Sequence, residues 1–311
     1  MDLLPLAAEV PFKTGDTIKQ AYQLQQQLGA DFNHFAKFYQ CGTHEDYKFV
    51  AMELLGPSFI QLASRHHPCR FNLHVLLKFG IQAIDALKQL HKAGFVHRDV
   101  KPDKFVIGNQ QNTTGLIYLI DFGLCKKLHK ENGVIAKPIQ PSNFRGSLRY
   151  ASPNAHKQIE LGRSDDLISL FYLMIELFIG KLPWSNIANS DIVLQQKLIY
   201  RGRVLIQQMP KEFHSFEDYI FSLDYTDEPD YQLIINLFKT IAVNEGIDLS
   251  QPFDWENEIN EQRSIVVQKQ LEILKQRRKD QKINKNNLTN QITTKIQKQI
   301  SERKAPIISA V

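Results

Sequence analysis

The sequence predicts an α+β fold, and three stretches carry this prediction. Residues 73–93 place apolar side chains at three- and four-residue steps, which indicates a long amphipathic helix with Gly94 as its C-terminal stop. Residues 115–123 form a short apolar run, rich in branched and aromatic side chains, after a turn-prone segment; this indicates a buried strand. Residues 165–180 are apolar nearly all round, which indicates a helix inside a large core.

The other elements follow from shorter signals. Residues 48–59 are expected to form a strand that ends in a linker, because Gly56 and Pro57 break any further regularity. Two further helical patterns lie near 213–223 and 231–243. The chain shows no internal repeat.

Composition indicates a soluble globular protein. The chain has 311 residues, 43% of them hydrophobic and 23% charged, enough for one large or two modest domains. Its apolar runs are too short or too polar to cross a bilayer, and no basic segment precedes the apolar residues at the N-terminus. Neither a membrane span nor a secretory signal is therefore expected. The three cysteines are scattered, and we expect reduced thiols in a cytoplasmic protein, without zinc or disulfides.

Residues 256–311 differ in character from the rest of the chain. They hold 12 Lys or Arg against 6 Asp or Glu, so the net charge of +5 belongs to this tail. Ile292, Ile296 and Ile300 share one helical face, and the tail is either an amphipathic helix or a partly disordered segment. Because the tail lacks aromatic side chains that would stack on bases, nucleic acid is not an expected partner.

Two short motifs carry the main functional signal. "HRDVKPDKF" occupies residues 97–105, and "DFG" occupies residues 121–123, behind a predicted helix and a predicted buried strand respectively. In this order and context they resemble the signature of eukaryotic protein kinases. The resemblance implies a bilobal protein-kinase-like α+β fold. Its parts would be a reduced N-terminal β lobe at 1–55, a mainly helical C-terminal lobe at 56–255 and the tail at 256–311.

Longer segments narrow the resemblance to the casein kinase 1 group. The segments similar to that group are "MELLGPSF", "GSLRYASPNAH" in place of an Ala-Pro-Glu ending, "DDLISLFYL", "LPW" and "DEPDYQLI". Within the group the chain most resembles the tau-tubulin kinase branch, on "NFRGSLRYASPNAH", "GRSDDLISLFYLMIELFIGKLPW", "FSLDYTDEPDYQLI" and "PFDWE". The resemblance covers roughly residues 16–256.

The resemblance assigns roles to residues of the two motifs. Asp99 would accept the proton of an attacking Ser or Thr hydroxyl, and Lys101 would place a positive charge near the γ-phosphate of ATP. Asp121 would chelate Mg²⁺, and Phe122 would pack inward. Asp166 matches the aspartate of a buried central helix that holds the catalytic loop from below.

Other residues would bind the nucleotide and the substrate. By resemblance, Met52 would be the gatekeeper, and the backbone of Glu53 and Leu55 would form hydrogen bonds with adenine. Arg149, with Arg145 near it in sequence, would form an anion site for acidic or phosphorylated substrates. A solvated basic rim is the alternative interpretation of these arginines.

Lys104 departs from the family at a position that bears on activity. The family has an asparagine there that ligates a second Mg²⁺, but an ammonium has no lone pair to donate and repels a divalent ion. We therefore expect Lys104 to swing away or to bind phosphate in place of the ion. In either case two-metal chemistry would be compromised.

The N-terminal segment departs from the family as well. Residues 10–44 contain no glutamate, and the nearest family register puts Ala21 where a glutamate should pair with the ATP-binding lysine. Lys13 is the candidate for that lysine, and no Gly-x-Gly-x-x-Gly precedes it. The upper sheet would shrink to strands near 9–13, 35–40 and 47–54.

Together these features predict a kinase fold whose catalytic output is weak or lost and which serves as a pseudokinase-like binding scaffold, cytoplasmic or cytoskeletal. Tubulin or microtubules are the expected partners, because the resembled branch acts on microtubule proteins and tubulin presents acidic surfaces to the basic tail. The alternative is an active Ser/Thr protein kinase that uses ATP and Mg²⁺, since both motifs are whole.

Overall fold

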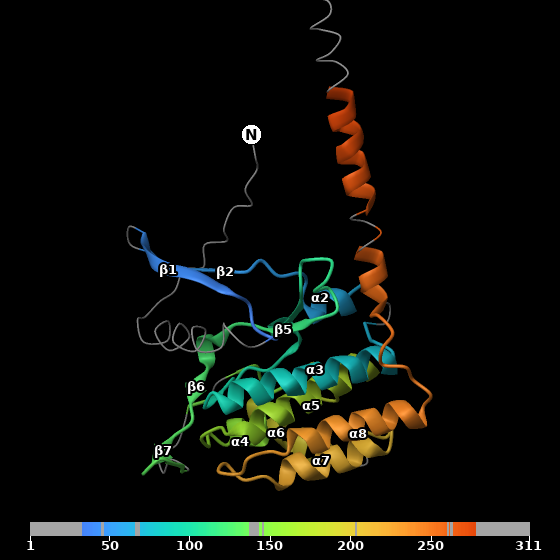
Figure 1. Cartoon of the computed structure of the whole chain (residues 1–311). Helices are drawn as coiled ribbons and strands as arrows, with labels where there is room; N and C mark the ends of the chain where they lie inside the picture. The colour runs from blue at the N-terminus through green and yellow to red at the C-terminus, as the bar shows by residue number, and fades with distance from the viewer. Residues whose placement is uncertain are drawn as a thin grey trace, which may run out of the picture. The chain divides into compact units, whose positions relative to one another are not determined.

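The computed structural model describes most of the chain between residues 33 and 277. The described residues are 33–44, 47–65, 69–136, 143–144, 146–202, 204–259, 261 and 264–277. They confirm the α+β prediction, because small two-stranded sheets accompany a mainly helical region (Figure 1). The chain divides into two compact units, residues 1–253 and 254–311. In the described part, no helix is long and apolar enough to cross a membrane.

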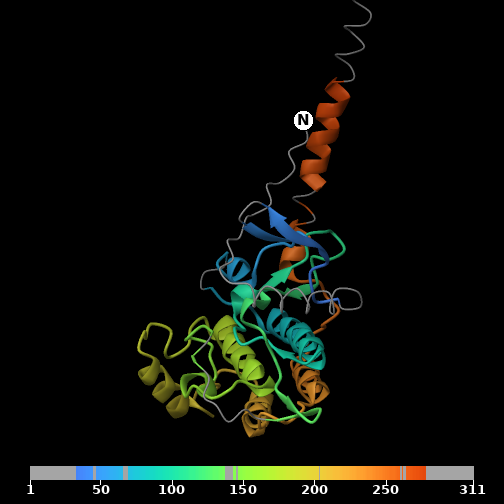
Figure 2. The ribbon, with the colours of Figure 1, turned by 90° about the vertical axis from the view of Figure 1, so that its left-hand side faces the viewer.

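The helical region is built around α5 (Arg163–Ile179), which is buried along nearly its whole length. This helix contacts α3 (Leu73–Lys92) and α7 (Glu212–Ser222), and α8 (Tyr231–Asn244) contacts α3 and α7. The four predicted helices are therefore confirmed, with each end within two residues of its predicted position. Figure 2 shows the blue strands of residues 38–44 and 47–52 above this helical layer.

Aromatic rings fill the space between these helices. Phe171 of α5, Phe216 of α7 and Phe238 of α8 are each 0% exposed. The ring centroids of Phe216 lie 5.5 Å from Phe171 and 5.3 Å from Phe238, in edge-to-face geometry. Such pairs stabilise a core beyond the burial of their apolar area alone. The all-round apolar pattern of α5 reflects its position among these rings.

The ends of the two long helices follow from local sequence. Asn72 caps α3 by accepting a hydrogen bond from the backbone nitrogen of Val75 at 2.9 Å. Gly94 beyond the end of α3 has φ +87°, and Gly180 beyond α5 has φ +96°. Both angles lie in the left-handed region that favours glycine, so the predicted stop at Gly94 is confirmed.

Short strands connect the helices and carry the two motifs. β4 (Phe105–Ile107) pairs with β5 (Ile117–Leu119) in antiparallel fashion, and β3 (Phe95–Val96) pairs with β6 (Lys126–Lys127). The single-turn helices η1 (Pro102–Lys104) and η2 (Phe122–Leu124) adjoin these strands. A further two-stranded pair joins β7 (Lys130–Glu131) and β8 (Val134–Ile135). The pairing brings residues 97–105 next to residues 121–123.

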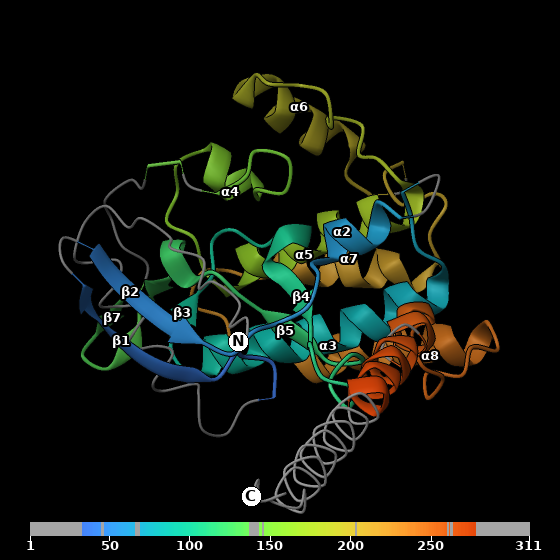
Figure 3. The same ribbon diagram turned by 90° about the horizontal axis from the view of Figure 1, so that it is seen from above.

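The upper sheet is a single hairpin of β1 (Phe38–His44) and β2 (Tyr47–Met52), seen side by side in Figure 3. These are two of the three strands predicted for this sheet. β1 begins at Phe38, three residues later than the predicted start at residue 35. The third, near 9–13, lies outside the described residues. Residues 53–57 then form the predicted linker to the short helix α2 (Phe59–Ala63).

Both ends of the hairpin are tied to the β4–β5 sheet. Before β1, the carbonyl of His34 accepts a hydrogen bond from the backbone nitrogen of Leu119 at 2.9 Å. The imidazole Nδ1 of His34 lies 2.7 Å from the carbonyl oxygen of Ile117. After β2, the backbone nitrogen of Gly56 donates to the carbonyl of Ile107 at 2.8 Å. The hairpin is thus fastened where it enters and where it leaves.

The second unit contains helical residues 254–259 and 264–277. Residues 264–277 of the tail are helical, and the choice between an amphipathic helix and a disordered segment for the tail as a whole stays a prediction. Ile292, Ile296 and Ile300 lie outside the described residues. The proposed boundaries at residues 55 and 255 stay predictions.

Candidate functional site

The loop at 97–105 is held from below by Asp166 of α5. Its Oδ2 accepts a hydrogen bond from the backbone nitrogen of His97 at 2.6 Å, and its Oδ1 accepts one from that of Arg98 at 2.8 Å. Nε2 of His91 lies 2.8 Å from the same Oδ2. Burial alone would raise the pKa of Asp166, but the contacts with His91 and His97 lower it overall. A buried carboxylate therefore organises the loop, as the resemblance implied.

Arg98 bends the loop at this point. Its φ of +66° lies in the left-handed region, which is costly for a residue with a side chain. Its Nε donates to the carbonyl of Leu124 at 2.7 Å, so the arginine joins the loop to the end of η2. The strained bend immediately precedes Asp99, which is buried.

Asp99 lies in a network of three polar side chains. Its Oδ1 accepts a hydrogen bond from Oγ of Ser147 at 2.8 Å, and its Oδ2 lies 3.0 Å from Nζ of Lys101. Lys101 also donates to Oγ of Ser147 at 2.9 Å. The side chain of Asp99 is only 8% exposed. This geometry fixes the carboxylate and leaves it close to an ammonium.

Lys104 lies between Asp99 and Asp121. Its Nζ is bonded to Oδ2 of Asp121 and is 3.7 Å from Oδ2 of Asp99. The structure places the ammonium of Lys104 at the carboxylates of both motifs, which attract it; the expectation that it swings away or binds phosphate when a metal and nucleotide are present stays a prediction. Burial raises the pKa of Asp121, but the bond and charge of Lys104 lower it overall.

The remaining DFG residues set the shape of η2. Phe122 is 6% exposed, and its ring centroid lies 5.7 Å from that of Phe35 and 5.8 Å from that of His97. The inward packing expected of Phe122 is therefore confirmed. The positive φ, +64°, occurs at Asp121 and not at Gly123, whose backbone nitrogen donates to Oδ1 of Asp121 at 3.2 Å. The turn is thus made by the aspartate itself.

These groups do not fit a magnesium ion as they are arranged. Mg²⁺ takes oxygen ligands in a nearly ideal octahedron. Of the two oxygens of Asp121, one accepts from a backbone nitrogen and the other from Lys104. The cation-binding capacity of Asp121 is therefore met by the protein's own ammonium.

The segment proposed to bind adenine lies between β2 and α2. Met52 is 43% exposed. The backbone nitrogen of Glu53 donates to the carbonyl of Lys37 at 2.8 Å, and the Glu53 side chain accepts from the Lys37 backbone nitrogen at 3.1 Å. Of the backbone groups of Glu53, its carbonyl is thus the candidate acceptor for adenine. The roles of Met52, Glu53 and Leu55 stay predictions, and Lys13 lies outside the described residues.

Arg149 already has partners within the protein. Its guanidinium donates to Oε1 of Glu176 and to the carbonyl of Ser185, both at 3.1 Å. The side chain remains 43% exposed, so an external anion would share it with Glu176. The anion site stays a prediction, and its second member, Arg145, lies outside the described residues.

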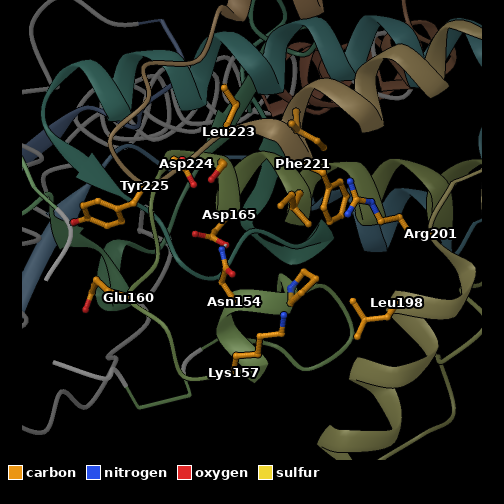
Figure 4. Close-up of a pocket in the computed structure, with 14 residues that line it drawn as sticks. Asn154, Lys157, Glu160, Asp165, Leu198, Arg201, Phe221, Leu223, Asp224 and Tyr225 are labelled. Atoms are coloured by element: carbon orange, nitrogen blue, oxygen red, sulfur yellow. The ribbon is translucent and has the colours of Figure 1, made fainter. Parts of the chain in front are cut away.

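A pocket of about 250 Å³ lies among α4 (Pro153–His156), α5, α6 (Ser190–Tyr200) and α7, apart from Asp99 and Asp121 (Figure 4). Asp165 lines it and accepts hydrogen bonds from Ser152, Asn154 and the backbone of Gly162. Burial raises the pKa of Asp165 to about 6. These three donors satisfy the hydrogen-bonding capacity of the carboxylate. Asp165 therefore stabilises the N-terminal end of α5, which begins directly after Gly162.

The comparisons agree with this fold. A family model described as protein kinase domain matches residues 11–242, so the chain belongs to the protein kinase family. A protein of Dictyostelium discoideum named as a probable serine/threonine-protein kinase is 36% identical over 248 residues, which is 79% of this chain. The match covers 50% of that protein, so the chain spans about half the length of this curated relative.

Two participants were not found from sequence. Ser147 bonds to both Asp99 and Lys101 although 48 positions separate it from Asp99. The signal lay in "GSLRYAS", where the serine directly follows Gly146. Lys197 is buried, and its Nζ donates to the carbonyls of Leu148 and Ala151 in the segment that follows Ser147. A lysine in a helix with scattered apolar residues gives no sign of this burial in the sequence.

Proposed function

We propose that this protein-kinase-family chain, of casein kinase 1 or tau-tubulin kinase type, has weak or lost phosphoryl transfer and acts as a pseudokinase-like binding scaffold. One observation carries the proposal: Nζ of Lys104 is bonded to Asp121, the expected metal ligand, and lies 3.7 Å from Asp99. A protein-supplied cation thus occupies the place between the two carboxylates.

Electrostatics indicate how strongly this arrangement opposes a metal ion. Two unit charges about 4 Å apart interact by roughly 4 kcal/mol at an effective dielectric constant of about 20, so a divalent ion at that distance from the ammonium faces about twice that repulsion. The side chain of Lys104 is only 14% exposed, so water screens it incompletely. Mg²⁺ would bind Asp121 only after Lys104 had left.

An active Ser/Thr kinase is the second candidate, and one observation favours it. Asp99, Lys101 and Ser147 form a connected network in which the carboxylate is oriented toward neighbouring donors. A base held in this way would serve proton transfer from a substrate hydroxyl. This candidate requires Lys104 to move and ATP to bind with Mg²⁺.

Phosphate transfer separates the two candidates. The purified full chain is incubated with labelled ATP, Mg²⁺ and either casein or tubulin, with Asp99→Asn as the matched variant. The scaffold proposal expects incorporation no higher than that of the variant. Robust labelling that is lost in Asp99→Asn would establish the enzyme instead.

Nucleotide binding is tested by thermal unfolding with ATP, with and without Mg²⁺. A ligand that binds only the folded state stabilises it by RT ln(1 + L/Kd), where L is the concentration of free ligand, and the unfolding temperature rises accordingly. The proposal expects Mg²⁺ to add nothing to any stabilisation by ATP. Stabilisation that requires Mg²⁺ would contradict it.

For the partner, we propose an acidic protein surface such as that of tubulin, at a cytoplasmic or cytoskeletal location. The tail at 256–311 carries 12 basic against 6 acidic side chains, and such charge favours association with acidic surfaces at low salt. Co-sedimentation with microtubules is expected for the full chain and not for a chain that ends at residue 255. Equal sedimentation of both at low salt would exclude the tail as the binding element.

A further inference from the structure

Lys197 of α6 is a buried lysine. It is 1% exposed, and its Nζ donates to the carbonyls of Leu148 at 2.9 Å and Ala151 at 2.6 Å. Nε2 of His156 lies 3.1 Å away. The ammonium lies 5.1 Å from the ring centroid of Tyr172 and 5.4 Å from that of Trp184, which adds cation–π attraction.

The two carbonyls belong to the segment 147–151, which also reaches the candidate catalytic group. Ser147 at its start donates to Asp99. Nε1 of Trp184 donates to the carbonyl of Arg149 at 2.8 Å, so a second side chain holds the segment from the same region. Buried carbonyls that lose their donors are costly. Removal of Lys197 would leave two of them without this donor on the path to Asp99.

The surroundings show how the lysine charge is accommodated. Among the described residues, no carboxylate lies within 4.0 Å of Nζ, and the titratable side chains that face it are His156 of α4 and Tyr172 of α5. Nδ1 of His156 lies 2.9 Å from Oγ of Ser190. Burial and the charge of Lys197 lower the pKa of His156 to about 4, so His156 is neutral near pH 7 and its Nε2 is available as an acceptor. Tyr172 is neutral too, because burial raises its pKa.

An ammonium has three N–H donors, and this site offers three acceptors: two carbonyls and one imidazole nitrogen. If Lys197 only filled space in the core, three acceptors would not need to surround its Nζ. Figure 3 shows α4 and α6 near each other on one side of the helical region, and the two helices are in contact. The lysine thus joins α6 to both α4 and the segment that follows Gly146.

We infer that Lys197 is a positioning residue: together with His156 it fixes the segment 147–151, and through Ser147 it sets the position of Asp99. A bound protein segment at Asp99 would meet a surface whose shape depends on this buried contact. The inference depends on the described geometry alone, so it holds whether or not the chain transfers phosphate.

Hydrogen exchange of backbone amides in the full chain tests this inference. Lys197→Met removes the donors and keeps much of the side-chain length. After correction for intrinsic rates, we expect protection of the amides at 147–152 to fall at least tenfold. Amides of α8 serve as the internal control and should keep their protection. Unchanged protection at 147–152 would overturn the inference.

A pH profile adds a readout that a purely structural role would not move. Burial lowers the pKa of Lys197 to about 7, whereas a hydrated lysine titrates near 10.4. Between pH 7 and 9, Lys197 is therefore mainly a neutral amine while it contacts segment 147–151, and it keeps two N–H donors for the carbonyls of Leu148 and Ala151. When the segment opens, the lysine is hydrated and binds a proton, so protection of 147–152 should rise by up to about tenfold per pH unit between pH 7 and 9. Lys197→Met should abolish this slope.

The unaltered chain alone provides the second measurement, which is needed if Lys197→Met fails to fold. In that chain the slope must appear at 147–152 and be absent from α8. A flat profile at 147–152, or the same slope in both regions, would contradict the role assigned to Lys197.

Discussion

Replacement of Lys104 by asparagine tests the central electrostatic argument. The change removes the ammonium bonded to Asp121 and restores a neutral oxygen ligand at the same position. Because Lys104 lowers the pKa of Asp121, its loss should move that pKa back toward the ordinary value of 3.8, although Asp121 stays ionised near pH 7. A metal ion could then use Asp121 together with the new amide oxygen.

The expected gain is smaller than the full Coulomb repulsion. That figure, roughly 8 kcal/mol for a divalent ion about 4 Å away, assumes a fixed ammonium and an effective dielectric constant of about 20. The side chain of Asp121 is 51% exposed, so solvent screens the site and Lys104 can move toward water. We therefore expect at least about a tenfold gain in Mg²⁺ affinity, which corresponds to about 1.4 kcal/mol.

The assay is a calorimetric titration of Mg²⁺ into the protein, without nucleotide and then with a saturating ATP analogue. Lys239→Asn, the same substitution at an exposed lysine of α8, is the matched control. Lys104→Asn should gain Mg²⁺ affinity, and the control should resemble the unaltered chain. If all three proteins bound Mg²⁺ equally, the ammonium would not govern the metal site and the reasoning would be refuted.

Three further substitutions test the support of the site. Asp166→Ala leaves the backbone nitrogens of His97 and Arg98 without their acceptor and should cost about 3–5 kcal/mol in urea unfolding. Folding lowers the pKa of Asp166, so the stability due to its charge should be present above about pH 4 and should disappear as pH falls through the folded pKa. Phe238→Ala should cost about 3–5 kcal/mol by the same measurement, because the ring is 0% exposed; a cost below about 1 kcal/mol would show that the core refills the cavity. Gly146 has φ +96°, and Gly146→Ala would bring a Cβ to 2.5 Å from the carbonyl oxygen of Arg98. The substitution should therefore cost about 1–3 kcal/mol and should raise amide exchange at residue 147; wild-type stability would exclude strain there.

Periodicity predicted the helical region well because its elements are long and their burial is one-sided or complete. The apolar steps of 73–93 and the uniform apolarity of 165–180 correspond to the faces that α3 and α5 bury. The start of β1 was placed three residues early, because a two-stranded hairpin has weak alternation and its register depends on pairing.

The sequence predicted which residues form the candidate site, but not which of their side chains contact one another. The motifs identify Asp99 and Asp121, yet the position of Lys104 between them depends on the bend at Arg98 and on the pairing of β4 with β5. The burial of Lys197 depends on carbonyls 46 and 49 positions away, which no local pattern reports.

The two tethers of the β1–β2 hairpin determine how this part of the molecule can move. A flap that is anchored at both ends tilts as a lever about the line through its anchors, here His34 and Gly56. Its tip, at His44 and Tyr47 where the described strands end and begin, would be displaced most, and residues 53–55 beside the pivot would be displaced least. A molecule bound against residues 53–55 would therefore contact a surface that moves little, and a collision with the tip of the hairpin would not displace that molecule.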